Sequence, residues 1–252
     1  MNDQAADLRE LVRRRATSRP AAGAQPARSV AVGGGKGGVG TTTSAVNLAV
    51  ALAARGHRTA LVDADPRGGD VAMLLGLDAR RTLADVLLGR STLDEALAPG
   101  PFGLWVLAAD WSETRVPHVP EDAEQRLFAE LGQRVDFVLA DTGNVPGPLA
   151  RRFWHSADMA LTVTTPETAA VMNAYARIKA THPSCTPEAI HTVVNRARSA
   201  RSVRKIDARL ARACRRFLGI SPVALGYVAD DPSIPAACGV HRPSVTLSLI
   251  HI

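Results

Sequence analysis

Short apolar runs alternate with stretches of helical periodicity along the chain from residue 30 onward. The apolar runs cover residues 30–32, 59–65, 104–109, 136–141, 159–165, 190–195 and 223–228. Because these runs lack polar alternation, they are typical of strands buried on both faces, as in a parallel sheet covered by helices. Helical spacing occupies residues 42–55, a stretch beginning at Leu83, and residues 121–134, 167–180 and 202–218. The pattern predicts the α/β class, with a single doubly wound, mostly parallel sheet and helices on both faces.

The two ends of the chain depart from this pattern. Residues 1–28 combine a short helical stretch with a linker that contains Pro20, Gly23 and Pro26, a composition typical of a flexible connection. We therefore expect the folded domain to span residues 29–246. Residues 247–252 are similar to the translation of a transposon end used in preparing sequencing libraries, and we expect them to be a non-native tail.

The composition narrows the class of protein. Hydrophobic residues make up 46% of the chain and charged residues 21%, which excludes wholesale disorder, collagen and coiled coils. Cys185, Cys214 and Cys238 show no C-x-x-C spacing, so neither a disulfide framework nor a zinc ribbon is indicated. The N-terminus lacks an apolar signal region, and no window approaches the ~18 apolar residues of a membrane span. We expect a cytoplasmic protein in a reducing compartment.

The net charge of +6 is unevenly distributed. Residues 1–28 carry +3 and residues 196–216 carry +8, so the rest of the chain carries −5. Within the second segment, helical spacing predicts that Ile206, Leu210, Cys214 and Phe217 pack on the sheet while the arginines project elsewhere. This basic face is either merely solvated or contacts anionic lipid, DNA or an acidic partner. Because no aromatic residues are interleaved with the arginines, nucleic acid is the less favoured of these partners.

A glycine-rich loop follows the first predicted strand. Six of the eight residues 33–40 are glycine, and a helical stretch begins just after them. Glycines let backbone N–H groups turn inward around an anion, and the helix N-terminus adds partial positive charge, so this arrangement suits a phosphate. The hydroxyl of Thr42 stands where a P-loop places its magnesium ligand.

Two chemistries compete for this loop, with a ligand-free glycine turn as a third interpretation. Gly33, Gly35 and Gly38 satisfy G-x-G-x-x-G, the dinucleotide fingerprint. Gly35 and Gly40 with Thr42 satisfy a P-loop spacing in which the lysine is missing. The consecutive threonines after the loop, and the acidic residues at two later strand ends, favour the P-loop.

The loop and two further blocks together resemble the MinD/ParA family of ATPases, from about Val30 to about Pro243. Residues 36–43 resemble the family's deviant Walker A motif, residues 61–65 its second strand and residues 135–141 its Walker B strand. The resemblance implies a P-loop NTPase fold for residues 29–246, with ATP and Mg²⁺ as cofactors. It also implies that nucleotide is bound by Gly35, Lys36, Gly37, Gly38, Val39, Gly40, Thr41, Thr42 and Thr43.

The resemblance assigns roles to individual residues. Lys36 would reach across a homodimer interface to the phosphates of ATP in the other subunit, and Asp65 would orient the attacking water, so these two are the catalytic candidates. Thr42, Asp63 and Asp141 would hold magnesium and its bound water, although Asp63 is alternatively a strand-end turn residue. Asn195 matches the position that reads adenine, where a side-chain amide offers both a donor and an acceptor.

The chain departs from the family pattern at Thr41, where the second Walker lysine is expected. Charge stabilisation of the transferring phosphoryl group is usually the largest catalytic contribution. We therefore predict weakened ATP binding and slow or absent hydrolysis, with a non-hydrolysing pseudo-ATPase scaffold as the alternative. The cellulose-synthesis members of the family also carry threonine here, so they and the chromosome-partition members remain alternatives.

The N-terminal segment resembles that of one branch of the family, the regulators of flagellar number known as FlhG or FleN. The matching residues include Asp3, Gln4, Ala5, Leu8 and Arg9. In that branch the segment acts on a GTPase partner, FlhF, so the resemblance implies partner binding here. An ordinary amphipathic tail is the alternative. In MinD and in this branch the family's last helix carries an amphipathic membrane anchor. We expect that helix to be missing here if residues 247–252 are non-native, so peripheral membrane contact is implied by the resemblance alone. Two other enzyme functions are disfavoured. An iron-protein-like reductase would need bridging cysteines, which the three cysteines do not supply by position, and a tyrosine autokinase would need a tyrosine-rich tail, whereas the chain has only two tyrosines.

Overall fold

The computed structural model describes residues 26–67, 70–109, 119–145 and 147–231. The N-terminal segment that carries Asp3, Gln4, Ala5, Leu8 and Arg9 lies outside the described residues, as do Cys238 and residues 247–252. In the described part of the chain, no helix is both long and apolar enough to cross a bilayer.

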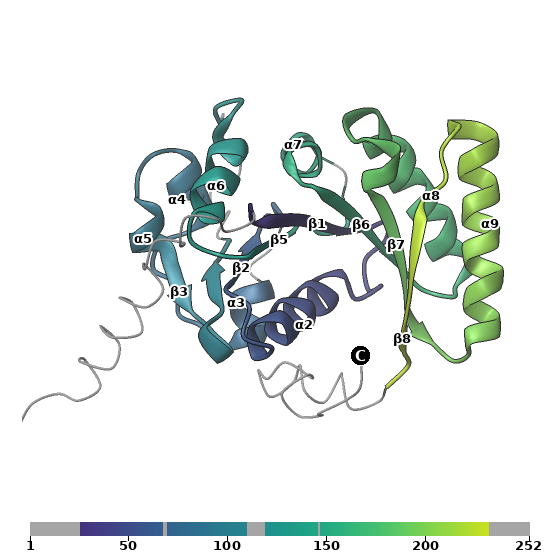
Figure 1. Ribbon diagram of the computed structural model, residues 1–252, viewed down its shortest axis with the longest axis horizontal. Helices are drawn as coiled ribbons and strands as arrows, with labels where there is room; N and C mark the ends of the chain where they lie inside the picture. The colour runs from purple at the N-terminus through teal and green to yellow at the C-terminus, as the bar shows by residue number, and fades with distance from the viewer. Residues whose placement is uncertain (1–25, 68–69, 110–118, 146, 232–252) are drawn as a thin grey trace, which may run out of the picture.

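The described strands form one eight-stranded sheet, which confirms the predicted architecture (Figure 1). Its spatial order is β3-β4-β2-β5-β1-β6-β7-β8. All neighbouring pairs are parallel except β3 and β4, which are antiparallel. The strands are β1 (Arg28–Gly34), β2 (Thr59–Asp63), β3 (Leu97–Pro99), β4 (Trp105–Leu107), β5 (Phe137–Asp141), β6 (Met159–Thr164), β7 (Ile190–Ala197) and β8 (Val223–Ala229).

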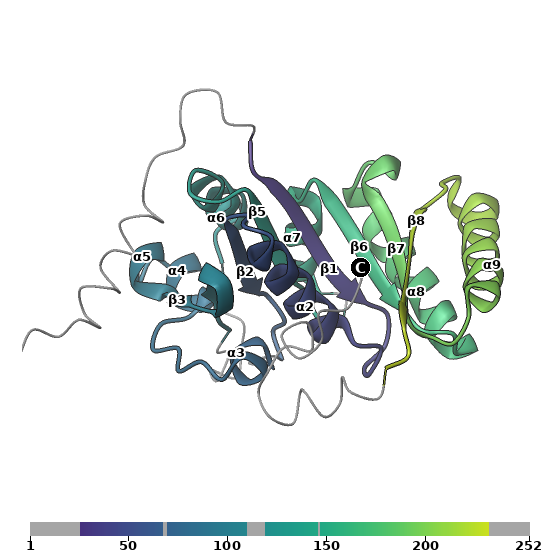
Figure 2. The ribbon, with the colours of Figure 1, turned by 60° about the horizontal axis from the view of Figure 1, so that its bottom comes forward.

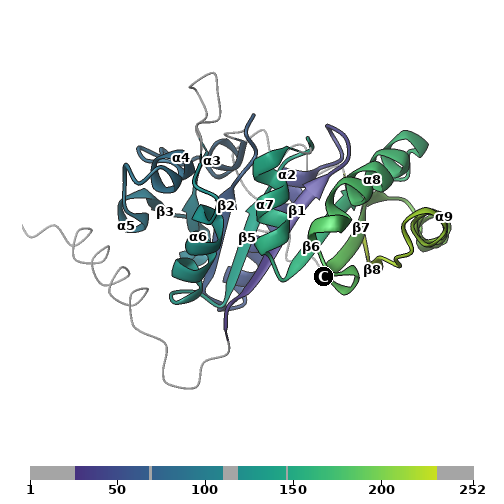
Figure 3. The ribbon, with the colours of Figure 1, turned by 90° about the horizontal axis from the view of Figure 1, so that it is seen from above.

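Helices cover both faces of this sheet (Figures 1 and 3). The described α-helices are α2 (Thr41–Ala54), α3 (Asp70–Leu75), α4 (Leu83–Leu87), α5 (Leu93–Ala96), α6 (Ala123–Gly132), α7 (Pro148–Ser156), α8 (Thr168–Thr181) and α9 (Ala200–Leu218). Short 3₁₀ turns occupy Pro101–Gly103, His182–Ser184 and Pro187–Ala189. The first helix of the pattern, α2, lies with α3 on one face, whereas α6 and α7 lie on the other (Figure 1).

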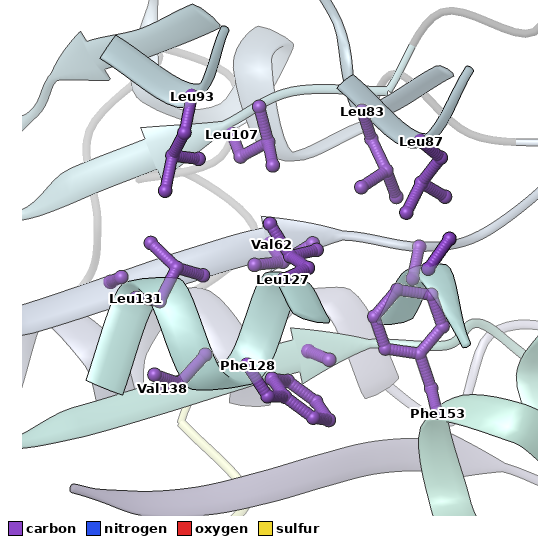
Figure 4. Packing of buried hydrophobic residues seen from close by; sticks show 14 of the residues in the cluster. Val62, Leu83, Leu87, Leu93, Leu107, Leu127, Phe128, Leu131, Val138 and Phe153 are labelled. Carbon is purple, nitrogen blue, oxygen red and sulfur yellow. The ribbon is translucent and has the colours of Figure 1, made fainter. Parts of the chain in front are cut away.

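The buried strands contribute side chains to the hydrophobic clusters on both faces of the sheet. Along β2, Ala60 and Val62 belong to the cluster beneath α4 to α7, while Leu61 between them belongs to the cluster against α2. Figure 4 shows the first cluster, where Leu127 and Phe128 of α6 meet Val62 and Phe153. A strand with apolar residues at successive positions is therefore covered on both sides, as the unalternating pattern predicts.

Three expectations about these elements need correction. The stretch beginning at Leu83 forms two short helices, because Thr82 and Thr92 each start a capping box of their own. The run over residues 223–228 was expected to be buried, but six of the seven residues of β8 are exposed and the seventh, Gly226, is partly buried, since β8 is an edge strand. Phe217 was expected to pack on the sheet and is instead 66% exposed.

Of the described helices, α3 and α7 were not predicted, and α7 is the one that reaches the site. Its signals are a proline in the first turn and two apolar residues four positions apart, Leu149 and Phe153, both of which are buried. This helix matters for the site because it carries the fully buried Trp154 to a position behind the end of β1.

Candidate functional site

The glycine-rich loop leaves the carboxyl end of β1 and opens directly into α2 (Figure 2). Gly38 and Gly40 adopt left-handed backbone conformations, with φ of 78° and 86°, which L side chains rarely adopt. A Cβ atom at Gly37 or Gly38 would meet nothing within 4 Å, so the backbone is open on that side. The N-cap of α2 makes no side-chain hydrogen bond and its first turn holds no acidic residue. Helix N–H groups that no side chain caps suit an anion.

Two carboxylates end neighbouring strands beside this loop. Asp63 of β2 and Asp141 of β5 are direct partners in the parallel register, and Asp141 is also the partner of Val32 in β1. Both carboxylates are 1% exposed. Asp63 accepts the N–H groups of Asp65 and Val71, each at 3.3 Å. The sheet thus brings together the two acids that the sequence placed at strand ends.

Asp141 is held in an environment that penalises its charge. Its Oδ1 atom accepts the Gly143 N–H at 3.0 Å, while the buried Oδ2 atom has no hydrogen-bond partner among the described residues. Burial raises the pKa of Asp141 to about 6, although the Thr42 hydroxyl and the Gly143 N–H act in the opposite direction. Asp65 raises it further by charge repulsion. A buried oxygen without a partner, next to a carboxylate and a hydroxyl, is suited to a cation.

Asp65 lies against the loop that follows β5. It is 8% exposed, and its Oδ1 atom accepts the Arg67 N–H at 2.9 Å. A Cβ atom on Gly143 would come under 3.0 Å from the Asp65 carboxylate, and Gly143 itself has φ of 63°. Only a glycine therefore allows this loop to approach Asp65 so closely.

Thr41 points into the protein. It is 1% exposed, and its hydroxyl donates to the Asn144 side-chain oxygen at 2.6 Å. A Cβ atom on Gly34 would come under 3.0 Å from both of these polar atoms. The position where the resemblance expects a lysine thus joins α2 to the loop after β5.

Lys36 is paired within the same chain. Its Nζ atom lies 2.9 Å from a carboxylate oxygen of Glu167, the N-cap residue of α8, and the two side chains are 42% and 61% exposed. This hydrogen bond lowers the pKa of Glu167. Because exposed ion pairs of this kind contribute little to stability, Lys36 is held in place only weakly.

Asn195, the sixth residue of β7, contacts the glycine-rich loop. Its amide nitrogen donates to the Val39 carbonyl at 2.9 Å, and its amide oxygen accepts the Arg196 N–H at 2.9 Å. A Cβ atom on Gly40 would come under 3.0 Å from the amide nitrogen. The residue predicted to read the base therefore touches the glycine loop, and among the described residues one of its amide hydrogens and one of its oxygen lone pairs have no partner.

Sequence reasoning missed one charged residue at this site. Arg177 of α8 is 1% exposed and lies behind the loop, where its guanidinium contacts Thr142 and the carbonyls of Gly34 and Gly143. The available signal was its spacing, because Arg177 occupies the same helical face as the buried Ala170, Val171, Ala174 and Ile178. An arginine at an apolar position of a helix is unusual unless it is paired.

The donor set suits a hard divalent cation. The hydroxyl of Thr42 and the carboxylates of Asp63 and Asp141 offer oxygen only, and Mg²⁺ is commonly held by one or two carboxylates, waters and substrate phosphates. No cluster of three or more His, Cys, Asp and Glu residues that could hold a metal occurs in the described ranges. The residues therefore fit Mg²⁺ bound together with a phosphate rather than a metal caged by protein ligands.

Comparisons with known proteins agree with this geometry. A family model described as "CobQ/CobB/MinD/ParA nucleotide binding domain" matches residues 30–244. Antiactivator FleN of Pseudomonas aeruginosa is 34% identical over 220 residues, covering 86% of this chain and 79% of that protein. Septum site-determining protein MinD of Bacillus subtilis is 31% identical over 223 residues, covering 85% and 81%. The solved structure of MinD from Pyrococcus horikoshii complexed with Mg-ADP superposes with a TM-score of 0.72 and 25% identity, covering 89% and 90%.

Proposed function

This chain belongs to the MinD/ParA family of nucleotide-binding proteins, and we propose that it is an ATP- and Mg²⁺-dependent switch whose dimerisation is set by the bound nucleotide. One observation carries the proposal: the register of β1, β2 and β5 sets Asp63 and Asp141 side by side at the mouth of the glycine loop. Ligands of open α/β sheets bind at the carboxyl ends of the strands.

Each part of the site then has a task. The backbone N–H groups of residues 35–43 cradle the phosphates, and Thr42, Asp63 and Asp141 hold Mg²⁺ directly or through water. When bound, Mg²⁺ would neutralise the negative charge that develops on the phosphate oxygens during hydrolysis. Asp65 orients the attacking water from its place against the loop after β5, and Asn195 reads the adenine edge.

Lys36 connects the site to dimerisation. In the single chain it is paired with Glu167, so it must leave that weak ion pair before it reaches the phosphates of a second subunit. The glycines on either side of it, Gly35 and Gly37, give the loop the freedom for this movement. A homodimer with ATP at its interface is the state we propose as active.

The cellular role that we propose is the regulation of flagellar number or placement. The similarity to antiactivator FleN and the N-terminal segment 3–9 support it. That segment would dock a GTPase of the FlhF kind, in a cytoplasmic protein with peripheral membrane contact. Nucleic acid is the less favoured partner. A cellulose-synthesis or chromosome-partition role is the alternative within the family.

Hydrolysis is expected to be slow, because Thr41 carries no charge where a lysine would neutralise the β- and γ-phosphates. The loss of one such contact commonly lowers a rate by a factor of about 10² to 10³. A pseudo-ATPase scaffold that binds ATP without turnover is the second candidate, and the buried, uncharged hydroxyl of Thr41 is the observation that favours it.

Single-turnover hydrolysis of ATP by the full chain tests both candidates. We expect the wild type to bind ATP and to turn it over slowly, Thr41→Lys to hydrolyse at least about tenfold faster, and Asp65→Ala to abolish turnover while it keeps ATP binding. If Asp65→Ala leaves the rate of ATP hydrolysis unchanged, the site does not catalyse hydrolysis and the pseudo-ATPase scaffold is favoured. If the wild type binds no ATP with Mg²⁺ present, the proposed function is wrong.

A further inference from the structure

The guanidinium of Arg177 is buried without a neighbouring carboxylate. In the ranges that the structure describes, no acidic oxygen lies within 4.0 Å of it, although eight other arginines make such ion pairs. Its Nη2 atom donates to the Thr142 hydroxyl at 2.7 Å, and its centre lies 4.6 Å from the ring centroid of Trp154. Its Nε atom has no hydrogen-bond partner among the described residues. An isolated buried cation is costly.

Burial lowers the pKa of Arg177 to about 10, so the group stays charged at neutral pH. The carboxylates of Asp141 and Asp65 favour the charged form from beyond ion-pair distance. The positive charge is thus maintained behind the site that we assign to nucleotide, and it is only partly compensated by the protein.

The guanidinium also holds the two loops that border this site. Nη1 lies 3.3 Å from the Gly34 carbonyl and 3.5 Å from the Gly143 carbonyl, and the Gly34 N–H donates to that same Gly143 carbonyl at 3.0 Å. In a trans peptide the C=O and the following N–H point in opposite directions. A cation that polarises these two carbonyls therefore strengthens the N–H groups of Gly35 and Asn144 as donors on the opposite side.

The fold reserves space for this side chain. A Cβ atom on Gly33 would come under 3.0 Å from both the Arg177 guanidinium and the Trp154 ring, and one on Gly35 would come under 3.0 Å from the backbone of α8. The glycines of the G-x-G pattern thus let α8 and its arginine approach the first strand, a role distinct from lining the nucleotide.

We propose that Arg177 is a positioning residue that supplies, from behind the glycine loop, the positive charge that Thr41 does not supply at the phosphates. The proposal rests on the proposed function. Its ligand class is a nucleoside polyphosphate, and its effect grows with the number of phosphates because each adds negative charge within the same field. A residue that merely filled space would act equally on all nucleotides.

The test compares ATPγS with ADP, each with Mg²⁺, by the ratio of their Kd values in the full-length protein. Arg177→Met is expected to reduce the preference for ATPγS by about tenfold, and Arg177→Lys, which keeps the charge, to retain it within about twofold. Lys179→Met is the matched control, since it removes the same charge from an exposed position of α8 and is expected to leave the ratio unchanged.

A rescue experiment separates charge from packing. In the double variant Thr41→Lys with Arg177→Met, the lysine restores charge at the loop, so the preference for ATPγS is expected to return. If Arg177→Met does not fold, the emission of Trp154 in a chain with Trp105→Phe and Trp111→Phe provides the measurement. ATPγS is then expected to shift that emission more than ADP.

The outcomes distinguish this proposal from the proposed function. If the wild type binds both nucleotides but Arg177→Met keeps the wild-type ratio, or if the two nucleotides shift Trp154 emission equally, Arg177 has no part in phosphate recognition. If the wild type binds neither nucleotide, the proposed function itself fails.

Discussion

Replacing Asp141 by asparagine should stabilise the nucleotide-free protein at neutral pH while it disables the site. The carboxylate is 1% exposed, its Oδ2 atom has no partner among the described residues, and burial raises its pKa from 3.8 to about 6. Asparagine keeps the acceptor for the Gly143 N–H and removes the charge. We expect the free energy of unfolding at pH 7 to rise.

The magnitude follows from the pKa. A rise of about two pKa units corresponds to about 3 kcal/mol of lost stability at pH 7, at 1.36 kcal/mol per unit. The asparagine amide nitrogen takes the place of an oxygen that has no partner, and an unsatisfied buried donor costs about 1 to 2 kcal/mol. The net gain expected for Asp141→Asn is thus about 1 to 2 kcal/mol, or about 4 °C in Tm for a chain of this size.

The pH dependence has a definite sign. Because the pKa of Asp141 is higher in the folded than in the unfolded protein, the folded state binds more protons between about pH 4 and pH 6. Stability of the wild type therefore falls as the pH rises through this window, and Asp141→Asn lacks that loss. The advantage of the variant should grow by about 2 kcal/mol between pH 4.5 and pH 7.

Urea unfolding of both proteins in EDTA, without nucleotide, at pH values from 4.5 to 8 measures this difference. Asp136→Asn is a control of opposite sign, because the hydrogen bonds of Asp136 with Arg58 lower the pKa of that carboxyl group. The Asp136 carboxylate therefore contributes stability above about pH 4, and this stability is lost as the pH falls through the lowered pKa. With Mg²⁺ and ATP, the wild type should gain stability and Asp141→Asn should gain little. A difference between wild type and Asp141→Asn that stays constant from pH 4.5 to pH 7 would refute the reasoning.

Two further predictions concern packing and charge. Gly33→Ala should lower the free energy of unfolding by about 2 kcal/mol, because the added methyl group overpacks against Arg177 and Trp154 behind the loop. Gly37→Ala, whose Cβ would meet nothing within 4 Å, should stay within about 0.5 kcal/mol of wild type. Equal losses of stability in urea unfolding would contradict this. Arg152→Met should cost about 3 kcal/mol, because it leaves the carboxylate of Glu124, 2% exposed, without its two guanidinium bonds of 2.6 Å. Arg126→Met removes the exposed ion pair of Arg126 with Asp122 at the start of α6, the helix that carries Glu124, and should change Tm by about 1 °C or less. A comparable loss in both variants would contradict the large cost expected for the buried pair.

Much of the fold was predictable because its signals are local. The strand and helix positions follow from the spacing of apolar residues, and β2, β5, β6 and α8 begin or end within two residues of the expected bounds. The nine residues of α7 were too short a stretch to stand out, and the exposure of β8 depends on its place at the edge of the sheet, which no periodicity within the strand reveals.

The candidate site divides in the same way. The sequence placed Asp63 and Asp141 at strand ends, and the parallel register then made them neighbours although they are far apart in the chain. The contacts of Lys36 with Glu167 and of Asn195 with Val39 join segments 131 and 156 residues apart, so their geometry depends on the strand order.

The family, the α/β class, the glycine loop and the acids beside it could all be inferred from the amino-acid sequence, because periodicity and motif spacing are properties of contiguous residues. The surroundings of each charge, in contrast, depend on the folded chain. Arg177 is buried behind the loop with no ion-pair partner in the part of the chain that the structure describes, the pKa of Asp141 is raised, and Lys36 is paired with Glu167. Burial and Coulomb interactions act through space, and the distances that control them are set only when the strands assemble into one sheet.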